Sequence, residues 1–364
     1  MDISVLKAVA KQMVAPGKGI IAADESSGTC QKRFDAVGVA CTEENRRQYR
    51  QTIFTAQGLE EYISGVILYD ETIRQKADDG TPFAEVLSKK GIFPGIKVDA
   101  GAKALALHEG EKVTEGLDKL RERLAEYKTL GAKFAKWRAV ITIGDSPAGE
   151  IPSEACIFAN AHAMARYAAL CQEADIVPIV EPEVLIDGDH TLERCHEVTE
   201  TTLEETFEEL RHQNVALEGT ILKASMVIAG KSAGGGSSSG GKAAKQSSVE
   251  EVADATLRVL TATVPKELAG VVFLSGGQGD EQATAHLNAM NRSTSLTAGK
   301  TGKYPWPLSF SYARAIQNPV LKKWAENTKA NVATAQEILL FRSKMNALAT
   351  LGKYSDEMEK ERPY

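Results

Sequence analysis

Eight short apolar runs, separated by helix-like stretches, are the feature that most restricts how this chain can fold. The runs span residues 19–24, 63–70, 92–99, 132–140, 176–183, 217–226, 271–276 and 307–312. Strands that alternate with helices form parallel β–α–β units. Eight such units predict a closed (β/α)8 barrel rather than an open doubly wound sheet. The first run also lacks the Gly-x-Gly-x-x-Gly pattern of a dinucleotide-binding fold.

The chain is longer than a barrel requires, which predicts additions at both ends. It has 364 residues, whereas a (β/α)8 barrel needs about 250. We expect one domain over residues 1–364, with an extra N-terminal helix at 4–14 and a C-terminal helix at 331–351. The charged residues 355–364 are expected to be a mobile tail.

One segment, residues 230–245, interrupts the alternation of strands and helices. It is rich in Gly and Ser, a composition typical of a flexible loop. Gly236, Gly241 and Lys242 have the spacing of a P-loop, but Ala243 stands where a P-loop has its magnesium-binding hydroxyl. We therefore expect a flexible loop after the sixth strand and no nucleotide site.

The composition narrows the possible partners. A net charge of -6 argues against a nucleic-acid-binding surface. The five cysteines include no Cys-x-x-Cys pair, and no His-Glu-x-x-His motif is present, so we expect neither a metal nor another cofactor. No apolar run reaches about 18 residues and the N-terminus does not resemble a signal peptide. These patterns predict a cytoplasmic protein without a membrane span.

Charge at the ends of the predicted strands is the first indication of function. Lys97, Lys136 and Lys223 stand in strand-like runs, where an unpaired ammonium would be costly to bury. Matching carboxylates occur at strand ends, at Asp24, Asp99, Glu181 and Glu183. Because residues i and i+2 of a strand face the same way, these groups can meet at the mouth of the barrel, where such folds carry catalytic groups. The alternative is a structural ion network that seals the barrel.

Lys223 is the best candidate for a nucleophile because it follows the apolar residues 219–222. Neighbouring cations and partial desolvation lower the pKa of a lysine, and Lys136 is the expected neighbour. A neutral amine attacks a carbonyl to form an imine, which withdraws electrons so that a nearby carbon–carbon bond can break. Glu181 is the expected proton shuttle in these steps.

Two further segments predict a phosphate site. Residues 274–278 (Leu-Ser-Gly-Gly-Gln) end the seventh run, where glycines let backbone N–H groups approach an anion. Residues 309–314 (Ser-Phe-Ser-Tyr-Ala-Arg) end the eighth run, and phosphate sites after strands seven and eight are common in these barrels. A simple turn is the alternative for the glycine pair. Ser26 and Lys97, across the mouth, predict a second phosphate and hence a doubly phosphorylated sugar as substrate.

Taken together, these motifs resemble the class I, Schiff-base fructose-1,6-bisphosphate aldolases over nearly the whole chain. The matching motifs are Ala-Ala-Asp24-Glu-Ser26, Thr-Glu-Glu-Asn-Arg-Arg47, Gly-Ile-Lys97-Val-Asp99, Phe-Ala-Lys136-Trp-Arg138, Val-Pro-Ile-Val-Glu181-Pro-Glu183, Leu222-Lys223, Phe-Leu-Ser275-Gly-Gly and Ser309-Phe-Ser-Tyr-Ala-Arg314. The resemblance implies reversible cleavage of fructose 1,6-bisphosphate to dihydroxyacetone phosphate and glyceraldehyde 3-phosphate without a metal. It also implies a role in glycolysis and gluconeogenesis and a homotetramer.

The resemblance further implies a role for each matching residue. The implied catalytic residues are Lys223 as the Schiff-base lysine, Glu181 as the acid and base of imine formation with Glu183 supporting it, and Asp24 and Lys136 as assistants in carbinolamine formation and bond cleavage. The implied substrate-binding residues are Ser275, Gly276, Ser311 and Arg314 near the ketone-side phosphate, and Ser26, Arg33, Lys97 and Arg138 elsewhere along the sugar. Tyr364 resembles the family's terminal tyrosine, which aids proton transfer at the enamine.

The chain departs from the family pattern at a few positions. Residues 224–226 are Ala-Ser-Met where the family has Pro-Asn-Met, Thr29 replaces a Ser, and Ala313 replaces a Gly. None of these changes removes a catalytic group. Two alternatives to the bisphosphate aldolase remain: another imine-forming lyase, such as a transaldolase or a deoxyribose-phosphate aldolase, and a barrel that serves as a binding or scaffold protein.

Overall fold

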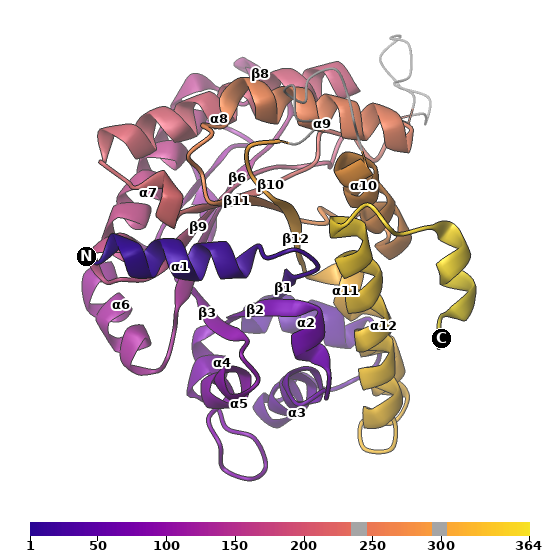
Figure 1. Ribbon diagram of the computed structural model, residues 1–364. Coiled ribbons are helices and arrows are strands. Elements are labelled where there is room, and N and C mark those ends of the chain that lie inside the picture. Colours follow the sequence, from indigo (N-terminus) through magenta and orange to yellow (C-terminus); the bar gives the residue numbers. More distant parts are fainter. Residues whose placement is uncertain (234–245, 293–303) are drawn as a thin grey trace.

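A closed barrel of eight parallel strands forms the centre of the molecule (Figure 1). The computed structural model describes residues 1–233, 246–292 and 304–364. The strands follow one another around the barrel in the order β1-β12-β11-β10-β9-β6-β3-β2. Their bounds are β1 (Gly19–Ala23), β2 (Ile63–Leu68), β3 (Phe93–Lys97), β6 (Phe134–Ile141), β9 (Val177–Val184), β10 (Ile221–Ala224), β11 (Gly270–Phe273) and β12 (Leu308–Tyr312). The predicted (β/α)8 barrel is confirmed.

Helices surround this barrel (Figure 1). They are α1 (Ile3–Met13), α2 (Ser27–Asp35), α3 (Glu43–Phe54), α4 (Asp70–Arg74), α5 (Phe83–Lys89), α6 (Leu120–Thr129), α7 (Glu154–Glu173), α8 (Leu192–His212), α9 (Val249–Thr263), α10 (Asp280–Arg292), α11 (Arg314–Glu326) and α12 (Val332–Thr350). Several begin after a Ser or Thr whose hydroxyl accepts a backbone N–H of the first turn, as Ser153 does for α7 and Thr191 for α8. Ser248 and Glu251 form a reciprocal capping box at the start of α9.

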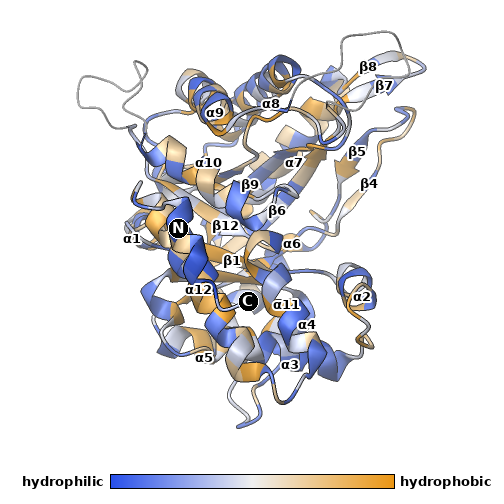
Figure 2. Cartoon of the chain, turned by 90° about the vertical axis from the view of Figure 1, so that its right-hand side faces the viewer, coloured by the Kyte–Doolittle hydropathy of each residue, from blue (hydrophilic) through white to orange (hydrophobic). Residues whose placement is uncertain are grey.

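Two short hairpins extend from the barrel and lie next to each other (Figure 2). The first pairs β4 (Ala102–Ala104) with β5 (Lys112–Thr114), and the second pairs β7 (Gly144–Ser146) with β8 (Gly149–Ile151). A cavity of about 250 Å³ between them is lined by residues of both. The first hairpin follows β3 and the second follows β6, so both stand beyond the carboxyl ends of barrel strands.

The expected N-terminal helix closes one end of the barrel. In Figure 1, α1 lies across this end. Its apolar side chains Leu6, Ala10 and Met13 are fully buried against the residues that fill the barrel interior. Those interior residues are Ile20, Ala22, Ile67, Phe134, Val177, Ile179, Ile221 and Val272. The lower part of the barrel is therefore a packed apolar core rather than a channel.

The sixth strand is shorter than the run of residues 217–226 predicts. Leu217–Gly219 form a 3-10 turn, and β10 begins only at Ile221. A Cβ atom placed on Gly219 would lie 2.9 Å from Cβ of Leu6, so α1 packs directly against this turn. The turn before β10 thus packs against the N-terminal helix at Gly219 instead of extending the strand.

The C-terminal tail, residues 355–364, is expected to be mobile, and that expectation stays a prediction. A 3-10 helix, η3 (Asp356–Glu361), follows α12 and places Glu359 in a buried site. There the fully buried guanidinium of Arg342 donates to both carboxylate oxygens of Glu359 at 2.7 Å, and the Tyr354 hydroxyl donates to Oε1 at 3.0 Å. One charge of the tail, Glu359, thus has a buried partner on α12.

The Gly/Ser segment is described only at its start. Residues 230–233 belong to the described chain, whereas the loop predicted from residue 234 to 245 lies outside the described residues. No described helix is both long and apolar enough to cross a membrane.

The ring of Phe134 leaves no room for a side chain at Gly95 in the barrel core. A Cβ atom on Gly95 would lie 2.2 Å from Cε2 of this ring, so Gly95→Ala should destabilise the fold by about 1–3 kcal/mol through overpacking. In a Phe134→Leu background the extra cost of Gly95→Ala should largely disappear. Urea unfolding of the four proteins of this double-mutant cycle measures the coupling.

Gly28→Ala is the matched control, because a Cβ atom there meets nothing within 4 Å. It lies in α2, where Ala is a better helix former than Gly, so its effect should be neutral or stabilising. Strictly additive costs for Gly95→Ala and Phe134→Leu would contradict the proposed contact.

Candidate active site

The alternation of side chains along the strands carries the charged residues to the open end of the barrel. Ala22, Phe134, Ile179 and Ile221 belong to the apolar interior. The residue two positions further along each of these segments faces the same way. Those residues are Asp24, Lys136, Glu181 and Lys223. Apolar packing below and charge above are thus two levels of one inward-facing surface.

These four charged side chains form one buried cluster. Glu181 joins the two lysines: its Oε1 lies 2.9 Å from Nζ of Lys223, and its Oε2 lies 3.3 Å from Nζ of Lys136. Lys136 also pairs with Oδ2 of Asp24 at 2.7 Å. None of the four side chains is more than 11% exposed. These distances confirm, for these four side chains, the prediction that strand-end charges meet in one place.

Each charge in the cluster is stabilised by its neighbours against the cost of burial. Burial alone would raise the pKa of Asp24, but Lys136 and Lys223 lower it to about 2. Burial likewise opposes ionisation of Glu181, and the same two lysines outweigh it and lower its pKa. For Lys136, the carboxylates of Asp24 and Glu181 outweigh burial and raise the pKa above its usual value. Lys136 is therefore a firmly charged group.

Glu181 has one further property that suits proton transfer. Its Oε2 is buried and accepts no hydrogen bond from any described residue, although Lys136 is close enough for an ion pair. A carboxylate with a free lone pair beside a lysine can take a proton from that lysine and return it to a bound substrate. The arrangement can therefore support amine chemistry on Lys223.

A second set of charges borders the cluster. Lys97 pairs with Oδ1 of Asp99 at 2.5 Å, and the Arg138 backbone N–H donates to Oδ2 of Asp99 at 3.2 Å. The Arg138 side chain pairs with Glu183. Lys97 and Lys136 are register partners on β3 and β6. Lys97 thus lies one strand from the cluster but has a carboxylate partner of its own.

The loop after β11 has the backbone conformation of an anion site. Gly276 and Gly277 have φ values of 57° and 92°, which other residues rarely adopt. The backbone N–H groups of residues 275–277 donate no hydrogen bond to any acceptor in the described part of the chain. A Cβ atom on Gly277 would lie 3.2 Å from Nη2 of Arg314, so this cation faces the loop. The predicted phosphate residues Ser275, Gly276 and Arg314 are brought together.

Other predicted residues are placed with fewer contacts. The buried Ser311 hydroxyl has no hydrogen-bond partner among the described residues. Ser26 is the N-cap of α2, and its hydroxyl accepts the Thr29 N–H at 3.4 Å. Arg33 pairs with Glu25, which also holds Arg50. No contact within the described chain joins Ser26 or Arg33 to Lys97, so the second phosphate site remains a prediction.

Tyr364 does not contact the lysine cluster in this structure. Its hydroxyl donates to Oδ2 of Asp280 at 2.9 Å, and its ring packs against Phe341. Asp280 is the first residue of α10, three positions after Gly277. The terminal tyrosine is thus held beside the loop of residues 275–277, and its catalytic role remains a prediction.

Sequence reasoning missed Lys231, which also faces the glycine loop. A Cβ atom on Gly277 would lie 2.7 Å from Nζ of Lys231. Lys231 belongs to the Gly/Ser segment, whose composition indicated only flexibility. Its place in the loop that follows β10 was the available signal, because loops after the strands border the mouth of a barrel.

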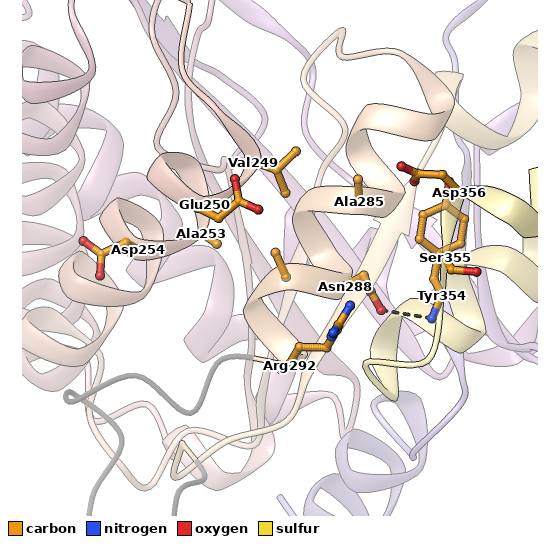
Figure 3. Close-up of a pocket in the computed structure, with 11 residues that line it drawn as sticks. Val249, Glu250, Ala253, Asp254, Ala285, Asn288, Arg292, Tyr354, Ser355 and Asp356 are labelled. Carbon is orange, nitrogen blue, oxygen red and sulfur yellow. Dashed lines mark hydrogen bonds between the residues drawn. The ribbon is translucent and has the colours of Figure 1, made fainter.

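A cavity of about 710 Å³ lies elsewhere on the molecule, between α9, α10 and the turn after α12 (Figure 3). It is lined by Glu250, Asn288, Arg292 and Tyr354, among others, and the Tyr354 backbone N–H donates to Asn288 across one side. None of the predicted catalytic residues lines this cavity. The chemistry therefore places the candidate active site at the barrel mouth. Among the described residues, no group of three or more His, Cys, Asp or Glu side chains could hold a metal ion.

Comparison with known proteins agrees with this chemistry. The model of the family named Glycolytic, described as fructose-bisphosphate aldolase class-I, matches residues 5–363. The chain belongs to the class I fructose-bisphosphate aldolase family. As a member, it is a carbon–carbon lyase, and the family acts on a phosphorylated sugar.

Relatives in several organisms support the same family. A probable fructose-bisphosphate aldolase class 1 of Xanthomonas campestris is 58% identical over 354 residues, which cover 97% of this chain and 99% of that protein. The cytoplasmic isozyme of fructose-bisphosphate aldolase from Spinacia oleracea is 47% identical, with 96% of this chain and 91% of that protein covered. The solved structure of a Plasmodium falciparum aldolase, in complex with TRAP and an inhibitor, matches with a TM-score of 0.89 and 44% identity over 97% of this chain and 95% of that one.

The lowered pKa of Asp24 predicts how this aldolase responds to acid. A carboxylate whose pKa falls to about 2 on folding stabilises the fold above its unfolded pKa of about 4, and this stability is lost as the pH falls toward 2. Asp24→Asn should therefore be about 2 kcal/mol less stable than the wild type at pH 7. The difference should shrink between pH 4 and pH 3, and urea unfolding at pH 7, 5, 4 and 3 measures it.

Asp118→Asn serves as the control, because Asp118 is exposed and makes no ion pair among the described residues. A difference between wild type and Asp24→Asn that stayed constant from pH 7 to pH 3 would show that the Asp24 charge contributes nothing.

Proposed function

We propose that the protein cleaves fructose 1,6-bisphosphate reversibly into dihydroxyacetone phosphate and glyceraldehyde 3-phosphate through a Schiff base on Lys223. One observation carries the proposal: the buried Lys223 ammonium lies 2.9 Å from a carboxylate, Glu181, whose second oxygen accepts no hydrogen bond from any described residue. A buried amine next to a proton acceptor is what imine formation requires. The second oxygen lets the same carboxylate handle successive protons.

The chemistry then follows from the groups in the cluster. Glu181 takes a proton from Lys223, and the free amine attacks the substrate ketone to form a carbon–nitrogen bond. Glu181 returns a proton to the carbinolamine hydroxyl, which leaves as water, and an iminium remains. The iminium accepts the electron pair of the C3–C4 bond when a carboxylate of the cluster takes the proton of the C4 hydroxyl. The aldehyde leaves, and protonation and hydrolysis of the enamine regenerate the amine and release dihydroxyacetone phosphate.

Asp24 and Lys136 act on charge rather than as nucleophiles. Their pair spans 2.7 Å, and both groups are ionised at neutral pH because each stabilises the other. The Lys136 ammonium can donate to the oxygens whose charge changes during carbinolamine formation and cleavage. Glu183 supports this arrangement from the next inward-facing position, where it holds Arg138.

The phosphates of the substrate define its orientation. The N–H groups of residues 275–277, the Ser311 hydroxyl and Arg314 are proposed to bind the phosphate next to the ketone. Ser26, Arg33, Lys97 and Arg138 are proposed to bind the opposite end of the sugar. Tyr364 is proposed to leave Asp280 and assist proton transfer at the enamine, which lies near the first phosphate.

The cellular setting is proposed from the family. We infer a role in glycolysis and gluconeogenesis and a cytoplasmic location, in line with the cytoplasmic isozyme among the relatives. We also infer a homotetramer of the 39.2 kDa chain. Sedimentation equilibrium should give a mass of about four chains at micromolar concentration, and a monomer across the whole concentration range would contradict this assembly.

The division of labour between Lys223 and Lys97 is testable. When the wild type is treated with dihydroxyacetone phosphate and borohydride, the reduced adduct should map to Lys223 by peptide mass spectrometry. Lys223→Ala should lose the adduct entirely, because Lys136, the other lysine of the cluster, is held in its charged form by Asp24 and Glu181. Lys97→Ala should still form the adduct with dihydroxyacetone phosphate, and its loss should appear as about a tenfold higher KM for fructose 1,6-bisphosphate, because it removes one charged contact at the opposite end of the sugar.

Thermal unfolding of each variant checks that the fold is intact. An adduct on another lysine in the wild type would refute the assignment of Lys223. Equal loss of trapping in both folded variants would refute the division of labour. Cleavage of a monophosphorylated sugar in preference to the bisphosphate would favour another imine-forming lyase.

A further inference from the structure

Lys231 stands on a backbone that neighbouring segments hold in place. Its N–H donates to the Ile186 carbonyl at 2.8 Å, and the N–H of Ser232 donates to the Gly188 carbonyl at 2.9 Å. The Gln246 side-chain amide donates to the carbonyls of Gly230 and Ala233 at 3.0 and 2.8 Å. The start of the segment after β10 is thus tied to the loop after β9 and to the chain before α9. A lysine on such a base has a defined direction.

The direction of the Lys231 side chain is toward the glycine loop. A Cβ atom on Gly277 would lie 2.7 Å from Nζ of Lys231 and 3.2 Å from Nη2 of Arg314. Two cations therefore face the same space above Gly277, together with the N–H groups of residues 275–277, which donate to no acceptor in the described chain. Two like charges held close together repel each other, and an anion between them offsets that repulsion. The space is therefore suited to a multiply charged anion.

The two cations differ in their partners within the described chain. Arg314 pairs with no described carboxylate, whereas Lys231 pairs with Oδ1 of Asp187 at 3.1 Å. Both members of that pair are well exposed, at 43% and 67%, so the pair is weak and its exchange costs little. A phosphate group carries close to two negative charges at neutral pH and is a stronger partner for an ammonium than one exposed carboxylate.

We propose that Lys231 determines specificity for a phosphorylated ketone by binding the same phosphate as Ser275, Gly276 and Arg314, and that Asp187 competes with that phosphate for the ammonium. The inference rests on the proposed function and adds a residue pair to it. Because the ammonium already lies over Gly277, binding exchanges one anion for another without moving the backbone. A ketone without a phosphate leaves Lys231 paired with Asp187 and gains nothing from it.

Substitutions of Lys231 and Asp187 should change the affinity for phosphate in opposite directions. Isothermal titration calorimetry with inorganic phosphate, at low ionic strength, measures the site without any catalytic step. Lys231→Ala should weaken phosphate binding about tenfold, because it removes one partly exposed charged contact. Asp187→Asn should strengthen binding, because it removes the competitor. Lys231→Arg should bind nearly as the wild type does.

Kinetics provide the second measurement. For fructose 1,6-bisphosphate, the loss in Lys231→Ala should fall on KM rather than kcat, since the residue binds the phosphate and not the reacting carbons. In borohydride trapping, the loss relative to wild type should be larger with dihydroxyacetone phosphate than with dihydroxyacetone. Lys323→Ala is the matched control: this lysine pairs with Glu326 within α11 and should leave both measurements unchanged.

The outcomes separate this inference from the proposed function. Phosphate binding within twofold of wild type in Lys231→Ala overturns the inference, as does a loss of binding in Asp187→Asn equal to that in Lys231→Ala. Absence of any Lys223 adduct in the wild type overturns the proposed function instead, and the calorimetry with inorganic phosphate still reports on Lys231. Equal losses with both ketones show a structural role and also overturn the inference.

Discussion

The bridge that Glu181 makes between Lys136 and Lys223 is the interaction on which the rest of the site depends. Taking a charge out of water costs several kcal/mol per ion, and only a complete set of partners offsets this. Here the set comes from three strands and the segment after a fourth: Lys136 on β6, Glu181 on β9, Lys223 on β10 and Asp24 just beyond β1. A slip of one residue in any strand would turn its charge away from the barrel. Barrel closure and charge balance are therefore the same requirement, and an open sheet could not meet it.

The barrel and the inward position of its charged residues could be predicted from the sequence, because two simple rules determine them. Alternating strands and helices predict the barrel, and the two-residue repeat of a strand predicts that Glu181 lies on the inward face with Ile179. The apolar residues before Lys223 and the chemistry of a nearby carboxylate predicted the roles of Lys223 and Glu181, and the resemblance to a family implied the same roles. The strand rule failed at residues 217–219, because Gly219 meets Leu6 and the packing of α1 decided the local structure.

The features that could not be predicted depend on contacts between distant segments with no repeat. Lys231 lies in a stretch whose composition indicates only flexibility, and its direction depends on Ile186, some 45 positions earlier. Arg342 has the appearance of an ordinary surface cation on a helix, yet it is fully buried and holds Glu359. Composition predicts how a segment behaves in isolation. It does not predict that Lys231 contacts Ile186 or that Arg342 contacts Glu359. The same holds for Tyr364, whose place beside Asp280 follows from the tail as a whole.

The closure of the lower barrel by α1 has a consequence for the traffic of water and protons. Leu6, Ala10 and Met13 are fully buried in the apolar interior with Phe134 and Ile221, so the described barrel offers no polar route from that end. The water lost when an imine forms, and the water needed to hydrolyse it, must pass through the opening that admits the sugar. A bound sugar thus closes that opening, and the protons that Glu181 takes and returns must be exchanged with the substrate rather than with bulk water. The N-terminal helix, which contributes no residue to the lysine cluster, in this way leaves the described active site with access from the barrel mouth alone.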